Sequence, residues 1–154
     1  MYAAVQPPAG IGFERVVVRA KNTSGSDIPA NRLVKIVAFF NDAAPTEVPT
    51  IALAGTAEQT TFAPIAATES LIPAGQWGDI VLQGPVEVEM SADGTTDGNG
   101  GLSTQITPGA SGQFSKPNAS KLACGLVINA TAGAVGEKAT VVIDAFGRGF
   151  TTAF

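Results

Sequence analysis

The side chains that could do chemistry in this sequence are mostly carboxylates, because its 154 residues include no histidine and only one cysteine. Glu87 and Glu89 stand two residues apart, and a pair of carboxylates is the machinery of glycoside hydrolysis. Asp79 and Asp144 form a second pair, since a weak internal similarity puts them in similar places. However, neither aspartate belongs to an Asp-Thr-Gly or Asp-Ser-Gly sequence, and alternating glutamates are routine on a solvent-facing strand. We therefore expect no catalytic residues, and the chain is not predicted to be an enzyme.

The missing histidines also exclude most other active sites and metal centres. Ser-His-Asp triads and Cys-His dyads need an imidazole, and zinc, copper and haem take His and Cys ligands. Residues 93–100 offer oxygen ligands in a Gly-rich loop, but they have neither the spacing nor the closing glutamate of a calcium-binding EF-hand. We expect no metal and no cofactor. Cys124, beside an apolar run, is expected to be a buried small hydrophobic residue.

The composition favours a protein that works packed against other subunits. Charged residues make up only 14% of the chain and the net charge is -4, whereas a free monomer usually keeps a more charged surface. An acidic chain without a basic patch is a poor candidate for binding nucleic acid.

The sequence contains no apolar stretch long enough to span a membrane, and its first residues lack the features of a signal peptide. We expect synthesis in a reducing cytoplasm, with no nucleic acid and no membrane as partners.

The pattern of apolar residues predicts an all-β fold of one domain, with little helix beyond one short turn near 118–122. Within the strand predicted around 79–90, Val86, Val88 and Met90 share one face, and Glu87 and Glu89 share the other. Gly84-Pro85 either bends this strand or divides it into two. The predicted strands are 13–20, 32–40, 48–53, 61–66, 79–90, 122–128 and 138–146. We divide the chain into an N-terminal arm (1–12), a β-domain (13–146) and a C-terminal tail (147–154).

Two parts of the sequence echo one another. Residues 64–82 align without gaps with residues 125–143, so that Gly75 meets Gly136. In addition, Ile28-Pro29-Ala30 and Ile72-Pro73-Ala74 each precede a predicted strand. The pattern indicates a small barrel or sandwich whose strands return in a pseudo-repeated way.

These segments carry a resemblance to a known family. The sequence around 72–84 reads Ile-Pro-Ala-Gly-Gln-Trp-Gly-Asp-Ile-Val-Leu-Gln-Gly, and related pieces lie at 28–35 and 124–127. This pattern resembles the tailed-phage capsid decoration proteins, also called cement or head-stabilising proteins, over roughly residues 20–146. The resemblance implies a small β-barrel or β-tulip-like domain with an extended N-terminal arm. It also implies a homotrimer on the outer surface of the virion capsid that bridges subunits of the major capsid protein.

The predicted binding residues follow from this resemblance and from the aromatic residues. An arm can add to a sheet edge of the capsid protein, and its anchors would be Tyr2, Val5, Ile11 and Phe13. Exposed aromatic side chains often anchor interfaces, so Trp77, Phe150 and Phe154 are candidates for a subunit interface. The aromatic tail is expected to pack on its own barrel or on a neighbouring subunit. The alternatives are a structural domain of a phage tail, baseplate or fibre, and a carbohydrate-binding β-module.

Overall fold

The computed structural model describes residues 14–38, 49–91, 105–116, 120–129 and 135–150, and these residues form strands and short 3-10 turns without an α-helix. The turns are η1 (Thr56–Gln59) and η3 (Ala110–Gly112). The strands are β1 (Val16–Asn22), β2 (Leu33–Ala38), β3 (Thr50–Leu53), β4 (Ile65–Thr68), β5 (Trp77–Glu89), β6 (Gln105–Pro108), β7 (Phe114–Ser115), β8 (Leu122–Ala123), β9 (Gly125–Asn129), β10 (Lys138–Asp144) and β11 (Gly149–Phe150).

Five of these strands close into a small barrel. The strand order β1-β3-β2-β4-β5 returns to its start because β1 also pairs with β5. The parallel contact between β1 and β3 is short and joins Lys21 to Thr50 and Asn22 to Ile51. All the other contacts in this ring are antiparallel. The prediction of an all-β fold built on a small barrel is therefore confirmed.

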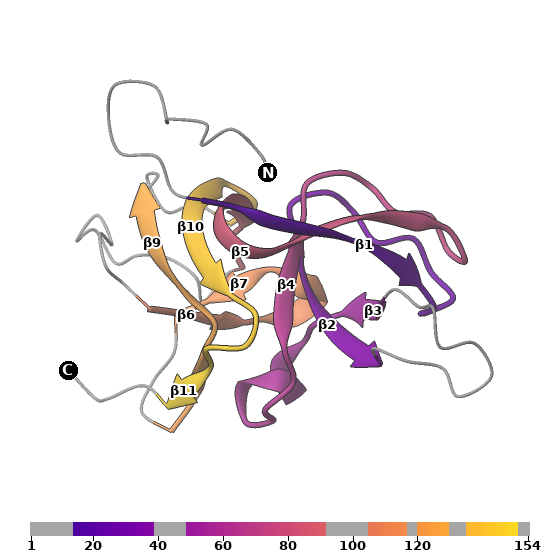
Figure 1. The fold of residues 1–154 in the computed structure, drawn as a ribbon. Coiled ribbons are helices and arrows are strands. Elements are labelled where there is room, and N and C mark those ends of the chain that lie inside the picture. The colour runs from indigo at the N-terminus through magenta and orange to yellow at the C-terminus, as the bar shows by residue number, and fades with distance from the viewer. Residues whose placement is uncertain (1–13, 39–48, 92–104, 117–119, 130–134, 151–154) are drawn as a thin grey trace.

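A second set of strands continues from the far half of β5, which is the longest strand (Figure 1). Residues 83–89 of β5 pair with β10, and the sheet goes on through β9 and β6 to β7. A parallel bridge between Met90 and Phe114 brings β7 back to the end of β5. The molecule thus consists of two strand circuits that share β5.

The alternation of side chains along the strands fills two cores. Val34 and Ile36 of β2 point into the barrel, where they meet Ile51, Ile80 and other apolar residues. Leu33, on the opposite face of the same strand, belongs to the larger core between the barrel and the second sheet. Val86, Val88 and Met90 lie in that larger core as well, which confirms the predicted facing of this strand. The barrel wall is therefore covered on both sides by apolar contacts.

Gly84 allows β5 to bend and pair with strands of both circuits. The strand is continuous through residues 77–89, so the structure selects one bent strand over two. Gly84 has φ of +106°, a conformation that side chains disfavour. A Cβ atom at this position would lie 2.5 Å from the backbone oxygen of Glu14. The glycine is required both by its backbone angle and by the close passage of the chain before β1.

Several predicted boundaries differ from the structure. The strand expected at 61–66 begins only at Ile65, because Arg148 binds the carbonyl groups of Thr61 and Ala63 outside any sheet. Strands β6, β7 and β11 were not predicted, and the segment expected at 122–128 is divided into β8 and β9. Residues 120–121 form a turn and an irregular link, and 117–119 lie outside the described residues, as do the arm and the loop at 93–100.

The internal similarity between residues 64–82 and 125–143 is reflected in the structure, where both segments form hairpins with similar turns. Segments 64–82 and 125–143 form the antiparallel hairpins β4–β5 and β9–β10, and Gly75 and Gly136 both have positive φ in their connections. The two Ile-Pro-Ala sequences lie side by side, because Ile28 and Ile72 exchange two backbone hydrogen bonds of 2.9 Å. The registers differ, since Val81 pairs with Ala67 whereas Val142 pairs with Leu126, two residues away from the equivalent position.

Candidate interaction surface

The outer face of the barrel presents a tryptophan between charged side chains. Trp77 opens β5 and is 46% exposed, and the Nζ atom of Lys21 on β1 lies 5.7 Å from the centre of its ring. Two positions further along the same pair of strands, Arg19 and Asp79 form an ion pair of 3.8 Å, with 63% and 66% of their side chains exposed. Cations over an aromatic face are attracted by its quadrupole, whereas a long, exposed ion pair contributes little. This face offers arginine, lysine and tryptophan to a partner.

The barrel end beside Trp77 is rigidly built. The buried Asn22 side chain donates to the carbonyl groups of Ser26 and Ile72 at 2.7 and 2.9 Å. Its backbone N–H donates to Gln76, and its carbonyl accepts from Gly75, both at 2.9 Å. Two loops are thereby locked together directly before Trp77. A surface that is held in place before binding loses less entropy when a partner arrives.

A second exposed face lies on the other circuit and carries two exposed carboxylates, with the exposed Lys138 at its edge on the same side of β10. Leu126, Val142 and Pro85 stand in register across β9, β10 and β5. Leu126 is 42% exposed, although its neighbours on the inner face are buried. The exposed carboxylates Glu87 and Asp144 lie on either side of this apolar row. Asp144 also accepts a hydrogen bond of 3.1 Å from the backbone of Phe146.

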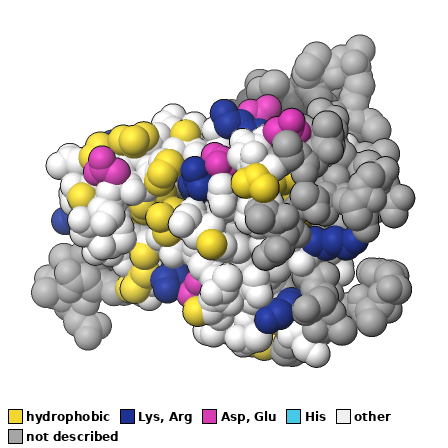
Figure 2. Space-filling model, turned by 180° about the vertical axis from the view of Figure 1, so that it is seen from behind, with side chains coloured by type: hydrophobic (Ala, Val, Ile, Leu, Met, Phe, Trp, Pro, Cys, Tyr) yellow, Lys and Arg dark blue, Asp and Glu magenta, His cyan; other side chains and the backbone are white. Residues whose placement is uncertain are grey.

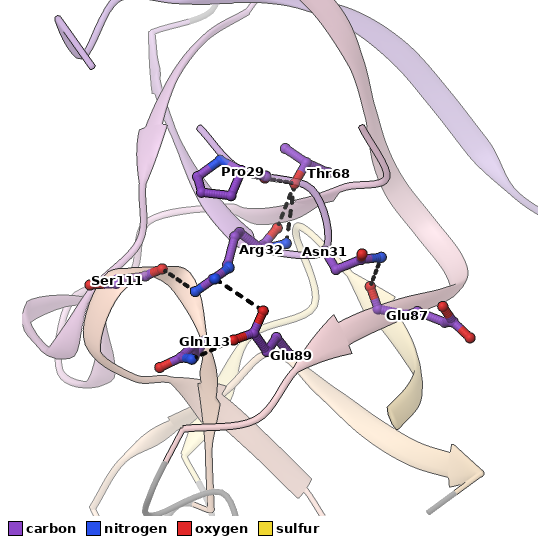
Figure 3. Close-up of polar contacts among 8 residues, drawn as sticks. All are labelled: Pro29, Asn31, Arg32, Thr68, Glu87, Glu89, Ser111 and Gln113. Atoms are coloured by element: carbon purple, nitrogen blue, oxygen red, sulfur yellow. Dashed lines mark hydrogen bonds and ion pairs between the residues drawn. The ribbon is translucent and has the colours of Figure 1, made fainter. Parts of the chain in front are cut away.

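A polar cluster joins the barrel to the second sheet (Figure 3). Arg32, just before β2, forms an ion pair of 3.0 Å with Glu89 at the end of β5. Gln113 donates to the other oxygen of that carboxylate at 2.8 Å, and Arg32 donates to the carbonyl of Ser111 at 3.3 Å. Thr68 binds the backbone around Arg32. The contacts assign these residues a structural role, and they remove Glu89 from the predicted pair of alternating, solvent-facing glutamates.

Arg148 ties the start of the C-terminal tail to the domain. Its guanidinium donates to five carbonyl groups, those of Glu58, Thr61, Ala63, Leu122 and Ala123, at 2.7 to 3.3 Å. Burial lowers the pKa of this guanidinium. Burial also raises the pKa of nearby Cys124 from 9.0 to about 12. The cysteine is thus a buried core residue, as expected, and its thiol does not ionise near neutral pH.

The described residues on the face in Figure 2 have a mixed surface. Charged side chains of both signs are interspersed among small hydrophobic groups on the face in Figure 2. Within the described ranges, no group of three or more His, Cys, Asp or Glu side chains could hold a metal ion. No helix in this part of the chain has the length and hydrophobicity needed to cross a membrane.

The structure places only some of the predicted binding residues. Trp77 is exposed on the barrel. Gly149 and Phe150 form β11, which pairs with β8 of the same chain, so the predicted tail begins on its own domain. The side chain of Phe150 is not described. Tyr2, Val5, Ile11, Phe13 and Phe154 lie outside the described residues. Their assignment to a capsid-binding arm and a subunit interface stays a prediction.

Sequence reasoning missed the residues that organise these surfaces. Asn22 looked like an ordinary residue of a polar loop, and Arg148 looked like part of an aromatic tail. One signal was available for Arg148, because it is a single charge between two glycines in a chain with few charges. A cation in such a place has reason to bind carbonyl groups that irregular backbone leaves unpaired.

Comparisons with known proteins find a similar fold. No family model matches the chain, and no curated protein matches it. Among solved structures, the N base of head fiber gp8.5 of bacteriophage phi29 superposes with a TM-score of 0.57 at 16% sequence identity. The match covers 84% of this chain and 96% of that chain. The two proteins share a fold over nearly the whole of the phi29 base.

Proposed function

We propose that this chain is a structural virion protein that attaches to the outside of a phage head. The observation that carries this proposal is the fold, which matches 96% of the base of a phage head fiber. The match agrees with the family resemblance of the sequence around 72–84, which points to head decoration independently of any structure. Two routes of inference therefore lead to a protein of the phage head.

The chemistry of the described residues supports a role without catalysis. Glu89, one of the two strand carboxylates, is held by Arg32 and Gln113. Asp79 pairs with Arg19, and Asp144 accepts from a turn. The thiol of Cys124 is buried and protonated. Glu89, Asp79, Asp144 and Cys124 thus each have a structural partner or a buried environment, which supports a binding role over a catalytic one.

The finer proposal is that the protein bridges subunits of the major capsid protein as a homotrimer. The N-terminal arm would provide the attachment, through Tyr2, Val5, Ile11 and Phe13. Three linked arms make the second and third contacts effectively intramolecular, which raises avidity. Because a ligand of the assembled shell stabilises it by mass action, heads that carry the protein should resist rupture better than bare heads.

One alternative deserves to be kept apart from capsid bridging. The matched structure is the base of a fiber, which supports a second candidate function as the head-proximal base of a fibre. A base and a cement protein both bind the head, but only a cement protein must stabilise the shell. A carbohydrate module is less well supported, because the exposed Trp77 lies on the barrel face, while Phe62 lies in the irregular segment before β4 and Phe146 on a turn after β10.

Sedimentation with purified heads tests the proposal directly. Heads of the phage that encodes this chain, prepared without the protein, are mixed with increasing amounts of it. We expect saturable co-sedimentation, and binding to tails alone would contradict attachment to the head. The temperature of DNA release from the same heads then separates the two roles. A rise on binding supports bridging, whereas an unchanged temperature supports a fibre base.

A further inference from the structure

Two exposed faces of the protein have complementary character. The basic face consists of Arg19, Lys21 and Trp77, on the second half of β1 and the start of β5. Its cations are exposed or half-buried, and among the described residues Arg19 has the 3.8 Å contact to Asp79 as its ion pair. Arginine and tryptophan are the residue types that most often dominate binding energy at protein interfaces. This face has the composition of a docking site.

The acidic face consists of Glu87, Leu126, Val142 and Asp144, and the exposed Lys138 lies at its edge, on the same side of β10 and opposite Glu89. Its centre is the apolar row that crosses β9 and β10, and the two carboxylates lie on opposite sides of that row. Apolar side chains at the centre and charges at the rim are the usual arrangement of an interface. The face therefore offers an apolar surface for Trp77 and carboxylates for Arg19 and Lys21.

A single copy cannot bring these faces together. Figure 1 shows the end of β1 on one side of the molecule and β9 on the other, with the barrel and the second sheet between them. Both faces belong to strands that are fixed by the shared β5, which pairs with β1 over residues 77–83 and with β10 over residues 83–89. The two faces can therefore meet only between different copies.

We infer that the basic face of one copy docks on the acidic face of the next. Such a contact is heterologous, and it forms a closed ring when the rotation between copies closes. The inference rests on the homotrimer of the proposed function, for which it names the contact surfaces. It also favours a protein partner over nucleic acid, because Asp79 within the basic face and the net charge of -4 would repel phosphates.

Charge reversal tests this contact most sharply. Light scattering of the full-length protein, at low ionic strength and over a concentration series, gives the mass of each variant. The variant Arg19→Glu/Lys21→Glu has an altered basic face and an intact acidic face. The variant Glu87→Lys/Asp144→Asn has an intact basic face and an altered acidic face. We expect each to remain monomeric by itself, while an equimolar mixture associates because complementary faces are present again. If both variants lose self-association and the mixture does not regain it, the inference is overturned. A wild-type protein that is monomeric at every concentration would overturn it as well.

Matched neutral variants guard against effects of misfolding. Lys21→Gln should weaken association about tenfold at low salt, because it removes a charge from the contact. Lys121→Gln removes the same charge elsewhere and should leave the mass unchanged. If the two variants weaken association equally, association depends on the net charge of the protein and not on the basic face. Nuclease treatment of the wild type must leave its mass unchanged, and dissociation would assign the basic face to nucleic acid instead.

Measuring the binding of the same variants to heads distinguishes a failure of this inference from a failure of the proposed function. If the reversal variants are monomers that still sediment with heads, the contact between copies and the attachment to heads are separate, and both proposals stand. If the wild type associates through these faces but does not bind heads, the proposed function fails alone. If the wild type binds heads and the reversal variants still associate, the inference about the faces fails alone.

Discussion

Arg148 shows how one side chain can determine the path of a chain end. Its five donors reach carbonyl groups on η1, on the segment before β4 and on β8, and a guanidinium is the one side chain with five N–H donors in a rigid plane. Substitution Arg148→Lys keeps the charge but supplies only three donors from one point. Some of the carbonyl groups would then lose their partners.

We therefore predict that Arg148→Lys lowers the free energy of unfolding by about 2 kcal/mol, in the range that unpaired buried polar groups cost. Urea denaturation measures this change. Arg19→Lys is the matched control, because Arg19 is exposed and its ion pair is long, and we expect a change below about 0.5 kcal/mol. Equal effects of the two substitutions would contradict the role assigned to Arg148.

Cys124 provides a prediction about pH. Its pKa is about 12 in the folded protein, so between pH 9 and 12 the unfolded thiol loses its proton while the folded thiol keeps it. The folded state then binds more protons, and stability falls as pH rises, by at most about 1.4 kcal/mol per pH unit from this group. The difference in stability between wild type and Cys124→Ala should thus be constant below pH 8 and shift against the wild type above pH 9.5. A constant difference across this range would contradict the raised pKa.

At the scale of residues, the sequence correctly indicated which side chains of a strand are buried, but it did not indicate which polar groups pair with one another. The alternation of Val86, Glu87 and Val88 indicated which residues are buried, because it depends only on the geometry of a strand. Glu89 followed the same alternation, yet its carboxylate is paired with Arg32, 57 positions earlier in the numbering. Such pairing depends on tertiary contacts, and no local pattern contains them.

At the scale of elements, β5 determines how the two circuits are joined. It pairs with β1 and β4 in its first half and with β10 in its second half, and the change occurs at Gly84. We predict that Gly84→Ala lowers the free energy of unfolding by about 2 to 4 kcal/mol, because strain from the backbone angle is added to a clash with the Glu14 carbonyl.

Gly75→Ala separates these two causes. Gly75 also has positive φ, but no atom lies within 4 Å of a Cβ placed there. Its substitution should cost only about 1 kcal/mol, the usual price of a side chain in the left-handed region. Thermal or urea unfolding of both variants measures the comparison, and a cost at Gly75 as large as that at Gly84 would show that the close passage at Gly84 has no effect.

The elements that the sequence did not predict share a physical reason. Strands β7 and β11 contain two residues each, and they exist because segments that the fold places beside them, β6 and β8, offer hydrogen-bond partners. By contrast, β1, β5 and β10 carry runs of β-branched residues, which favour strands by themselves. A pattern within a window of residues can identify strands of the second kind, whereas strands such as β7 require knowledge of the fold.

At the scale of the whole molecule, the two cores and the cluster around Arg32 make the described domain a rigid unit, and the proposed attachment resides in the arm. Attachment to a head should therefore be separable from folding. We predict that deletion of residues 1–12 weakens binding to heads by at least about 10²-fold, because the proposed trimer would lose all three arms together and with them the avidity of linked attachments. The same deletion should leave the free energy of unfolding unchanged, since the strands and cores described begin at Val16.

Point variants within the arm decide whether its apolar side chains cause this loss. Tyr2→Ala/Val5→Ala removes two of the predicted anchors, and Gln6→Ala changes a polar position of the same segment. If alternate apolar side chains fill pockets of a capsid sheet edge, the double variant should show most of the effect of the deletion, and Gln6→Ala should show little. Co-sedimentation with heads measures all three proteins. Undiminished binding of the deleted chain would move the attachment from the arm to the barrel surface, where Trp77 would become the first residue to substitute.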